Sequence, residues 1–180
     1  MERFFLAALC RAPGVGSRVA ASLVRVFGSA QDAWHARAEA LRAAHLSPER
    51  AAALYDFCRR NEALPEEIAA ACEKGGISLV VPSDEAYPAL LKEIYNPPQT
   101  LFCRGSLDCL KHPAVAMVGA RHASAYGKGA AEDIALGLAE RGFVVVSGAA
   151  RGIDTASHKG ALQAGATVAV LGCGVDVAYP

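Results

Sequence analysis

Apolar residues recur at helical spacing through the first 71 residues, a region rich in alanine. The residues that set this rhythm are Leu6, Leu9, Val19, Leu23, Val26, Leu41, Leu46, Leu54 and Phe57. Glycine or proline interrupts it at Pro13, Gly14, Gly28, Pro48 and Pro65. Because these residues favour helix ends, while spacings of three and four create one apolar helix face, we predict a small bundle of short helices.

The pattern changes after Gly75, where short runs rich in β-branched residues predict strands. These runs cover residues 77–81, 101–103, 115–118, 144–146 and 168–171. The last three end in glycine-containing turns, and alanine-rich helices are expected between them at 127–141 and 155–164. Such alternation is typical of a parallel sheet, and the continuously apolar "FVVVSG" indicates a strand buried on both faces.

The two patterns together predict an α/β protein with two domains. Residues 1–72 are expected to form a small all-helical domain, and residues 73–180 a Rossmann-like, mostly parallel sheet with helices on both faces. Within the first domain, "APGVGSRVAASLVRVFGS" is similar to SAM-like and helix-hairpin-helix modules, whose second helix offers amides to a DNA phosphate. A glycine turn that only joins two packed helices explains the same stretch.

The composition is that of an ordinary globular protein with no general affinity for a polyanion. The 180 residues are 53% hydrophobic, and 18 basic residues balance 18 acidic ones, so nucleic-acid binding would need a local cationic patch. The six cysteines form no CxxC pair and no zinc spacing, which predicts reduced thiols in a cytoplasmic protein without a metal. No stretch reads as a signal peptide or membrane helix, so no membrane partner is expected.

The turn "GARHASAYGKG" places Gly119 at a strand exit and Arg121 two residues later. A glycine lets a phosphate approach the backbone, an arginine binds it through paired hydrogen bonds, and helix amides near Gly127 would add donors. The alternative for Arg121 is an ion pair with Glu132 or Asp133. The turn lacks GxGxxG, and the chain has no Walker GxxxxGK[ST], so neither a nicotinamide nor an ATP cofactor is expected.

The next turn, in "SGAARGIDTASHKG", predicts a second anion contact. Gly148 lets the chain leave its strand tightly, and Arg151 projects from the turn. Asp154 is expected to cap the following helix, with His158 packed on the same helix. Ser147 lies outside a GxSxG motif and has no general base nearby in the sequence, which argues against a hydrolase.

The third turn, "LGCGVDVAYP", brings Gly172 and Gly174 to the same edge, and we interpret Cys173 as a small buried filler. All three turns follow parallel strands, whose carboxyl ends share one edge of the sheet. Two arginines and Lys159 converge there without paired carboxylates, a metal cluster or an activated nucleophile. The sequence therefore predicts a binding site and not an enzyme.

Four stretches resemble the DprA/Smf family of DNA-processing proteins: "YPALLKEIYNPPQTLFCRGSL", "VAMVGARHASAYG", "VVVSGAARGIDTASHKGAL" and "TVAVLGCGVDVAYP". The resemblance covers about residues 77–180 and implies an extended Rossmann fold. It implies a non-catalytic protein that binds single-stranded DNA, protects it on entry and loads the RecA recombinase during natural transformation. Ala120 stands where this family commonly has serine or threonine, which removes one phosphate donor.

The resemblance also implies particular residues and partners. Phosphate contacts carry over onto Gly119, Arg121, Ser147, Gly148, Arg151 and Lys159, and less directly onto the stretch near Tyr179. The family forms homodimers through later strands of its sheet, and this chain stops at Pro180. We therefore expect a truncated sheet with an exposed edge and weakened dimerisation.

Two other functions are open to a sheet with glycine turns at its edge. A nucleotide-metabolising enzyme similar to the nucleoside-monophosphate phosphoribohydrolases should carry a PGGxGT-type loop and a catalytic glutamate, and these 180 residues show neither. A nicotinamide oxidoreductase should carry the glycine fingerprint that is missing here.

Overall fold

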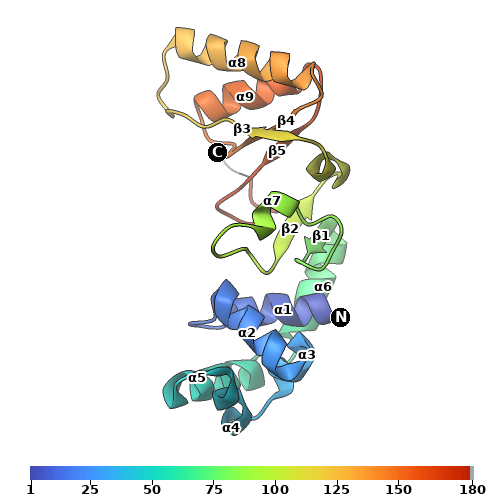
Figure 1. The fold of residues 1–180 in the computed structure, drawn as a ribbon, viewed down its shortest axis with the longest axis vertical. Coiled ribbons are helices and arrows are strands. Elements are labelled where there is room, and N and C mark those ends of the chain that lie inside the picture. The colour runs from blue at the N-terminus through green and yellow to red at the C-terminus, as the bar shows by residue number, and fades with distance from the viewer. Residues whose placement is uncertain (179–180) are drawn as a thin grey trace. The chain divides into compact units, whose positions relative to one another are not determined.

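The computed structural model describes residues 1–178, which divide into two compact units, Met1–Arg104 and Gly105–Pro180. Helices make up most of the first unit (Figure 1). They are α1 (Glu2–Arg11), α2 (Ser17–Phe27), α3 (Ala30–His35), α4 (Ala38–Leu41), the 3₁₀ helix η1 (Arg42–Ala44), α5 (Pro48–Arg60) and α6 (Leu64–Gly75). Gly28 ends α2 in the left-handed conformation, and Pro48 opens α5. The predicted bundle of short helices is confirmed.

One apolar core holds the first unit together. Its largest fully buried side chains include Leu9, Leu23, Leu41 and Leu54. Trp34 packs edge-on against Phe5 and Phe57, with ring centroids 6.5 and 6.1 Å apart. Removing a side chain of this size from water stabilises the fold by about 2 kcal/mol, so this core is the main source of the unit's stability.

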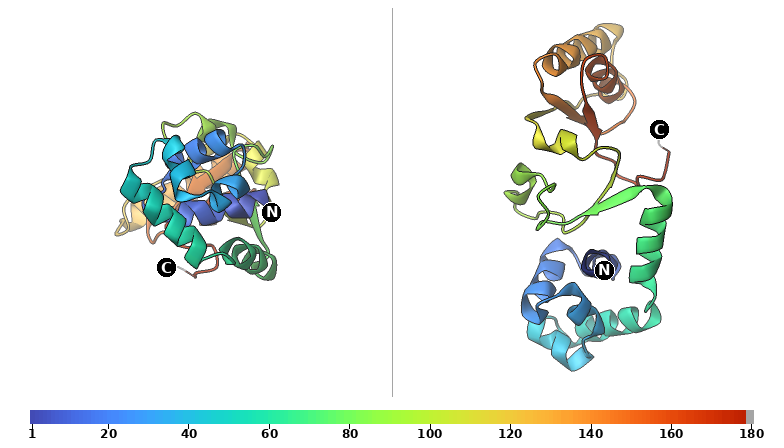
Figure 2. Two further views of the ribbon diagram at one scale, coloured as in Figure 1. Left: turned by 90° about the horizontal axis from the view of Figure 1, so that it is seen from below. Right: turned by 90° about the vertical axis from the view of Figure 1, so that its right-hand side faces the viewer.

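A β-hairpin completes the first unit. Helix α6 leads directly into β1 (Ile77–Val80), which pairs antiparallel with β2 (Leu101–Arg104), as the right-hand view of Figure 2 shows. The short helix α7 (Ala89–Lys92) lies in the connection between the strands. Leu79 of β1 is buried in the same core as the helices. The predicted domain boundary after residue 72 falls within α6 and stays a prediction.

The second unit contains the parallel sheet. After the 3₁₀ helix η2 (Asp108–Lys111), its elements are β3 (Ala114–Ala116), α8 (Ala125–Ala139), β4 (Val144–Ser147), α9 (Ile153–Ala161) and β5 (Thr167–Ala169). The strand order is β3-β4-β5, and Val145 lies opposite Val115 on one side and Thr167 on the other. The predicted α/β fold class, with these strands and both crossover helices, is confirmed.

Helices α8 and α9 pack against each other and against β4, on one face of the sheet (Figure 1). Right-handed crossovers between strands added in sequence order place successive helices on the same side. The predicted helices on both faces are therefore not found among residues 105–178, because they require a reversal of strand order that the order β3-β4-β5 does not include. Across the described part of the chain, no helix has the length and apolar character needed to cross a bilayer.

The contact between α8 and α9 is unusually close because it lacks large side chains. A Cβ atom on Gly160 of α9 would overlap the carbonyl oxygen of Glu132 on α8. Around this point the buried residues are small, with Ala135, Ala139 and Ala161 among them. The alanine-rich character of both helices thus lets their backbones meet above the sheet.

Candidate functional site

The turns that follow β3 and β4 touch through their backbones. The amide of Ile153 donates to the carbonyl of Ala120 at 3.2 Å. A Cβ on Gly119 would lie 2.7 Å from the Ile153 side chain, and one on Gly152 would overlap the carbonyl oxygens of Ala120 and Arg121. Gly152 also has a φ of 86°, which only glycine adopts without strain. The sheet edge thus brings together the two turns that the sequence assigned to it.

Arg121 and Arg151 present free guanidinium groups on these two turns. Both side chains are exposed, and neither forms an ion pair with any residue between 1 and 178. The alternative pairing of Arg121 with Glu132 or Asp133 is therefore not found. Two exposed cations on contacting turns form an arrangement that suits an anionic ligand.

Ser147 is buried at the end of β4, and its hydroxyl already has a partner inside the protein. Its side chain is 3% exposed, and its hydroxyl donates to the carbonyl of Met117 at 2.7 Å. Since the donor is used inside the protein, this hydroxyl links the ends of β3 and β4 and does not face a ligand. The predicted phosphate contact of Ser147 remains untested.

Asp154 does not cap α9, contrary to the prediction. Gly152 occupies the cap position, and the helix begins at Ile153. The Asp154 carboxylate is 7% exposed and accepts from the amide of Ala150 at 3.4 Å, inside the turn. A Cβ on Gly148 would lie 2.9 Å from this carboxylate. Asp154 therefore supports the turn from within, and Gly148 provides the space for it.

Thr155 and Ala149 also fix the turn after β4. The Thr155 hydroxyl donates to the carbonyl of Ala150 at 2.7 Å. Ala149 has a φ of 55°, a left-handed conformation that is uncommon for a residue other than glycine. Strained residues of this kind often lie at binding sites, where the surrounding contacts hold them.

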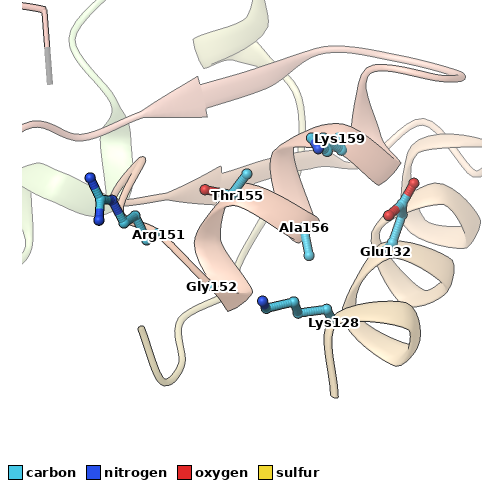
Figure 3. Close-up of a pocket in the computed structure, with 7 residues that line it drawn as sticks. All are labelled: Lys128, Glu132, Arg151, Gly152, Thr155, Ala156 and Lys159. Atoms are coloured by element: carbon cyan, nitrogen blue, oxygen red, sulfur yellow. The ribbon is translucent and has the colours of Figure 1, made fainter. Parts of the chain in front are cut away.

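A pocket of about 290 Å³ lies between α8 and α9, beside this turn. Figure 3 shows the residues that line it: Lys128, Glu132, Arg151, Gly152, Thr155, Ala156 and Lys159. Lys128 points from α8 toward Gly152, Lys159 lies on α9, and Arg151 extends from the turn. The structure thus brings Arg151 and Lys159 to one pocket, while Arg121 is not among its lining residues.

Lys128 is a candidate site residue that the sequence interpretation missed. It lies one helical turn after Ser124, the N-cap of α8, whose hydroxyl accepts from the amide of Gly127 at 3.1 Å. This cap could have been recognised in the sequence, and it would have placed Lys128 near the turn that carries Arg121. The amide of Gly127, expected to be free for a phosphate, is already bonded to this cap.

His158 is packed inside the second unit, as predicted. The Thr167 hydroxyl donates its only proton to the carbonyl of Val145 at 2.7 Å. In the 2.7 Å hydrogen bond between this hydroxyl and His158, the donor is therefore Nδ1 of His158. Its Nε2 is buried without a partner among the described residues. Burial lowers the pKa of His158 below its ordinary 6.5, and the negative charge of Asp154 partly opposes this shift. No group of three metal-binding side chains occurs in residues 1–178.

The third turn departs from the prediction at its cysteine. Cys173 is exposed, so it is not a buried filler. Gly172 and Gly174 follow β5, and a Cβ on Gly174 would overlap the side chain of Asp176. Tyr179 lies outside the described residues.

The model for DNA recombination-mediator protein A matches residues 78–180 of this chain. The DNA processing protein DprA of Streptococcus pneumoniae is 52% identical over 98 residues, which are 54% of this chain and 34% of that protein. The protein Smf of Synechocystis is 32% identical over 188 residues, covering 99% of this chain and 46% of the relative.

A solved structure agrees with these matches. The X-ray structure of DprA from Streptococcus pneumoniae superimposes with a TM-score of 0.80 at 31% identity, covering 100% of this chain and 61% of that one. The chain thus spans between a third and a half of the length of these two curated relatives. The matched residues include the two turns that carry the free arginines described above. The chain belongs to the DNA recombination-mediator protein A family, that of DprA and Smf.

Proposed function

We propose that this protein binds single-stranded DNA at the rim formed by Gly119, Arg121, Gly148, Arg151 and Lys159, and acts as a non-catalytic recombination mediator. In this role it protects DNA that enters the cell during natural transformation and loads RecA onto it. It acts in the cytoplasm, in agreement with a sequence whose six cysteines form no CxxC pair and no zinc spacing.

The observation that carries the proposal is the meeting of two turns that each present an unpaired arginine. Their backbones are fixed by the contact between Ile153 and Ala120 and by the bonds around Ala150. A guanidinium held beside such a rigid turn binds phosphate without first breaking an internal ion pair. Because the chain has no net charge, this local rim has to supply the attraction.

Single strands suit this rim better than a duplex. Tyr126, in the first turn of α8, is 86% exposed and follows the turn that carries Arg121. Exposed aromatic rings stack on unpaired bases, whereas the bases of a duplex are already stacked on each other. Phosphate contacts from arginine and stacking on tyrosine together describe a site for a flexible single strand.

The state of the reactive side chains supports a role without catalysis. Ser147 uses its hydroxyl on a backbone carbonyl, and His158 binds Thr167 through one ring nitrogen while the other is buried. Neither residue is therefore available as a nucleophile or a general base at the rim. Membership of the family supports the mediator role, which is the one its description names. The RecA partner and the homodimer are proposed from the family resemblance, and this chain covers only about a third of the length of a DprA relative.

Fluorescence anisotropy with a labelled single-stranded oligonucleotide and its duplex tests the proposal. The single strand should bind more tightly, and each of Arg121→Ala and Arg151→Ala should weaken it about tenfold, as expected for losing one charged hydrogen-bonding group. In a plot of the logarithm of the binding constant against the logarithm of the salt concentration, the slope should become less steep by about 0.7 for each lost phosphate contact. Arg50→Ala, at an exposed position of α5, is the matched control. Binding that is independent of salt, or equally weakened by Arg50→Ala, would contradict the proposal.

A further inference from the structure

We propose that the pocket between α8 and α9 receives a terminal phosphate monoester of a nucleic-acid strand. The inference rests on the proposed function, since it identifies which part of the strand lies between Lys128 and Lys159. The pocket is separate from the contact made by Arg121, which does not line it. The two contacts can therefore be tested independently.

The charge of the pocket matches a monoester. Lys128, Arg151 and Lys159 are opposed by one carboxylate, Glu132, which leaves two net positive charges on the lining. None of the three cations forms an ion pair within residues 1–178. A phosphodiester inside a strand carries one negative charge, whereas a terminal monoester carries about −1.5 to −2 at neutral pH. A site with two excess positive charges therefore favours a strand end over a position inside the strand.

The arrangement of the lining residues also suits a strand that ends here. Lys128 and Lys159 reach the pocket from different helices, and Arg151 comes from the turn (Figure 3). Glu132 lies on α8 at the side away from Arg151, and its Oε1 accepts from Gln163 at 3.1 Å. A fixed carboxylate there repels further phosphates, so the chain of phosphates leads from this pocket toward Arg151 and not past Glu132.

The size of the pocket agrees with this ligand. Its volume of about 290 Å³ exceeds the needs of one bare phosphate group and lies at the lower end of the range for small-ligand sites. Thr155 lines it with a hydroxyl whose proton is donated to Ala150, so its oxygen is left as an acceptor. A terminal phosphate bound by the three cations, together with a sugar hydroxyl near Thr155, would fill the pocket.

The experiment compares oligonucleotides of one sequence that differ only at their ends: a 5′-phosphate, a 3′-phosphate, or hydroxyls at both. On the full 180-residue chain, one phosphorylated end should bind about tenfold more tightly than the unphosphorylated strand. Lys128→Gln should reduce this ratio to about one, while Lys74→Gln, at an exposed position of α6, should leave it unchanged. The ratio should also shrink below about pH 6, where the monoester loses its second charge.

The affinities of the three oligonucleotides decide whether the pocket binds a terminal phosphate. Equal affinity for all three ends, or a preference that survives Lys128→Gln, overturns the inference and leaves the binding through Arg121 and Arg151 untouched. If no oligonucleotide binds, the proposed function fails, and titration with a deoxynucleoside monophosphate then tests the pocket alone. If the mononucleotide binds the wild type and not Lys128→Gln, the pocket is a phosphate site whose ligand is a free nucleotide. If the mononucleotide does not bind the wild type, the inference is overturned.

Discussion

The two units of the molecule use their charged residues in opposite ways. In the first unit, charged side chains add structural bonds between the elements that surround the apolar core. The Glu2 carboxylate accepts from the amides of Ala30 and Gln31 at the start of α3. Arg3 donates to the carbonyl of Leu79 at 2.6 Å and forms an ion pair with Asp84 at 3.1 Å. These bonds connect segments that are far apart in the sequence.

In the second unit, hydroxyl groups make the corresponding structural bonds. Backbone carbonyls accept hydrogen bonds from the side chains of Ser147, Thr155, Ser157 and Thr167. The cations near the sheet edge, Arg121, Lys128, Arg151 and Lys159, form no ion pair within the described chain. Neutral hydroxyl groups therefore make these structural bonds and leave the four cations near the sheet edge available to a ligand, since no internal ion pair competes for them.

Gly160→Ala should have the largest effect on stability, and it should unfold the second unit alone. The new Cβ would overlap the Glu132 carbonyl and push α8 away from α9, at a cost of about 3 kcal/mol. Hydrogen exchange should show loss of protection in both helices, while the amides of α1 and α2 keep theirs. Gly129→Ala on α8, where a Cβ meets nothing within 4 Å, is the control and should be neutral or slightly stabilising. Retained protection in Gly160→Ala would show that the close helix contact is not required.

Ser147→Ala tests whether the hydroxyl at the end of β4 is a structural group or a ligand contact. It leaves the partly buried Met117 carbonyl without its donor, which should lower the free energy of unfolding by about 2 kcal/mol. Chemical denaturation measures this change, and Ser83→Ala at an exposed position should change it by less than about 0.5 kcal/mol. Unchanged stability with weaker DNA binding would instead support the direct phosphate contact that the sequence predicts.

Arg3→Ala and Arg151→Ala contrast a paired cation with an unpaired one. Arg3→Ala removes a partly exposed ion pair and a bond to a backbone carbonyl, so it should cost about 1 kcal/mol of stability. Arg151→Ala should change stability by less than about 0.5 kcal/mol and affect only DNA affinity. Urea denaturation of both variants provides the measurement. A larger loss of stability in Arg151→Ala would mean that this cation supports the fold after all.

The sequence predicted the elements of the fold and most of the candidate site, because both depend on local patterns. Alternating apolar runs and glycine turns located β3, β4 and β5, and the position of Arg121 and Arg151 after two parallel strands placed them at one edge. Asp154 was misassigned because a glycine with a positive φ, Gly152, caps α9, so the helix starts two residues earlier than the sequence suggests. Such a cap depends on the contact with the preceding turn, which the sequence does not reveal.

The pocket beside Lys128 and the attachment of the hairpin were not predicted, for a related reason. The pocket containing Lys128 exists because Gly160 lets α8 and α9 approach closely, and that contact joins residues distant in the chain. Likewise, Leu79 places β1 in the core of the helical unit. Tertiary packing of this kind has no periodic signal in the sequence, whereas helices and strands do.

The smallest predicted effect concerns His158, a titratable group that the second unit keeps neutral. Protonation would place an N–H on the buried Nε2, which has no partner in the described structure, and burial accordingly lowers the pKa of His158 below 6.5. The unfolded chain binds this proton at a higher pH than the folded one. The stability of the protein should therefore be unaffected by His158 above about pH 6.5 and fall as the pH drops below it.

Unfolding by urea at pH 7.5 and at pH 5.5, in the wild type and in His158→Asn, isolates this contribution. Asparagine retains a donor near the Thr167 oxygen but does not titrate, so its stability should depend less on pH than that of the wild type. The other four histidines, His35, His45, His112 and His122, are exposed and present in both proteins, so their contributions cancel in the difference. An equal pH dependence in both proteins would show that His158 accepts a proton in the folded state as easily as in the unfolded chain.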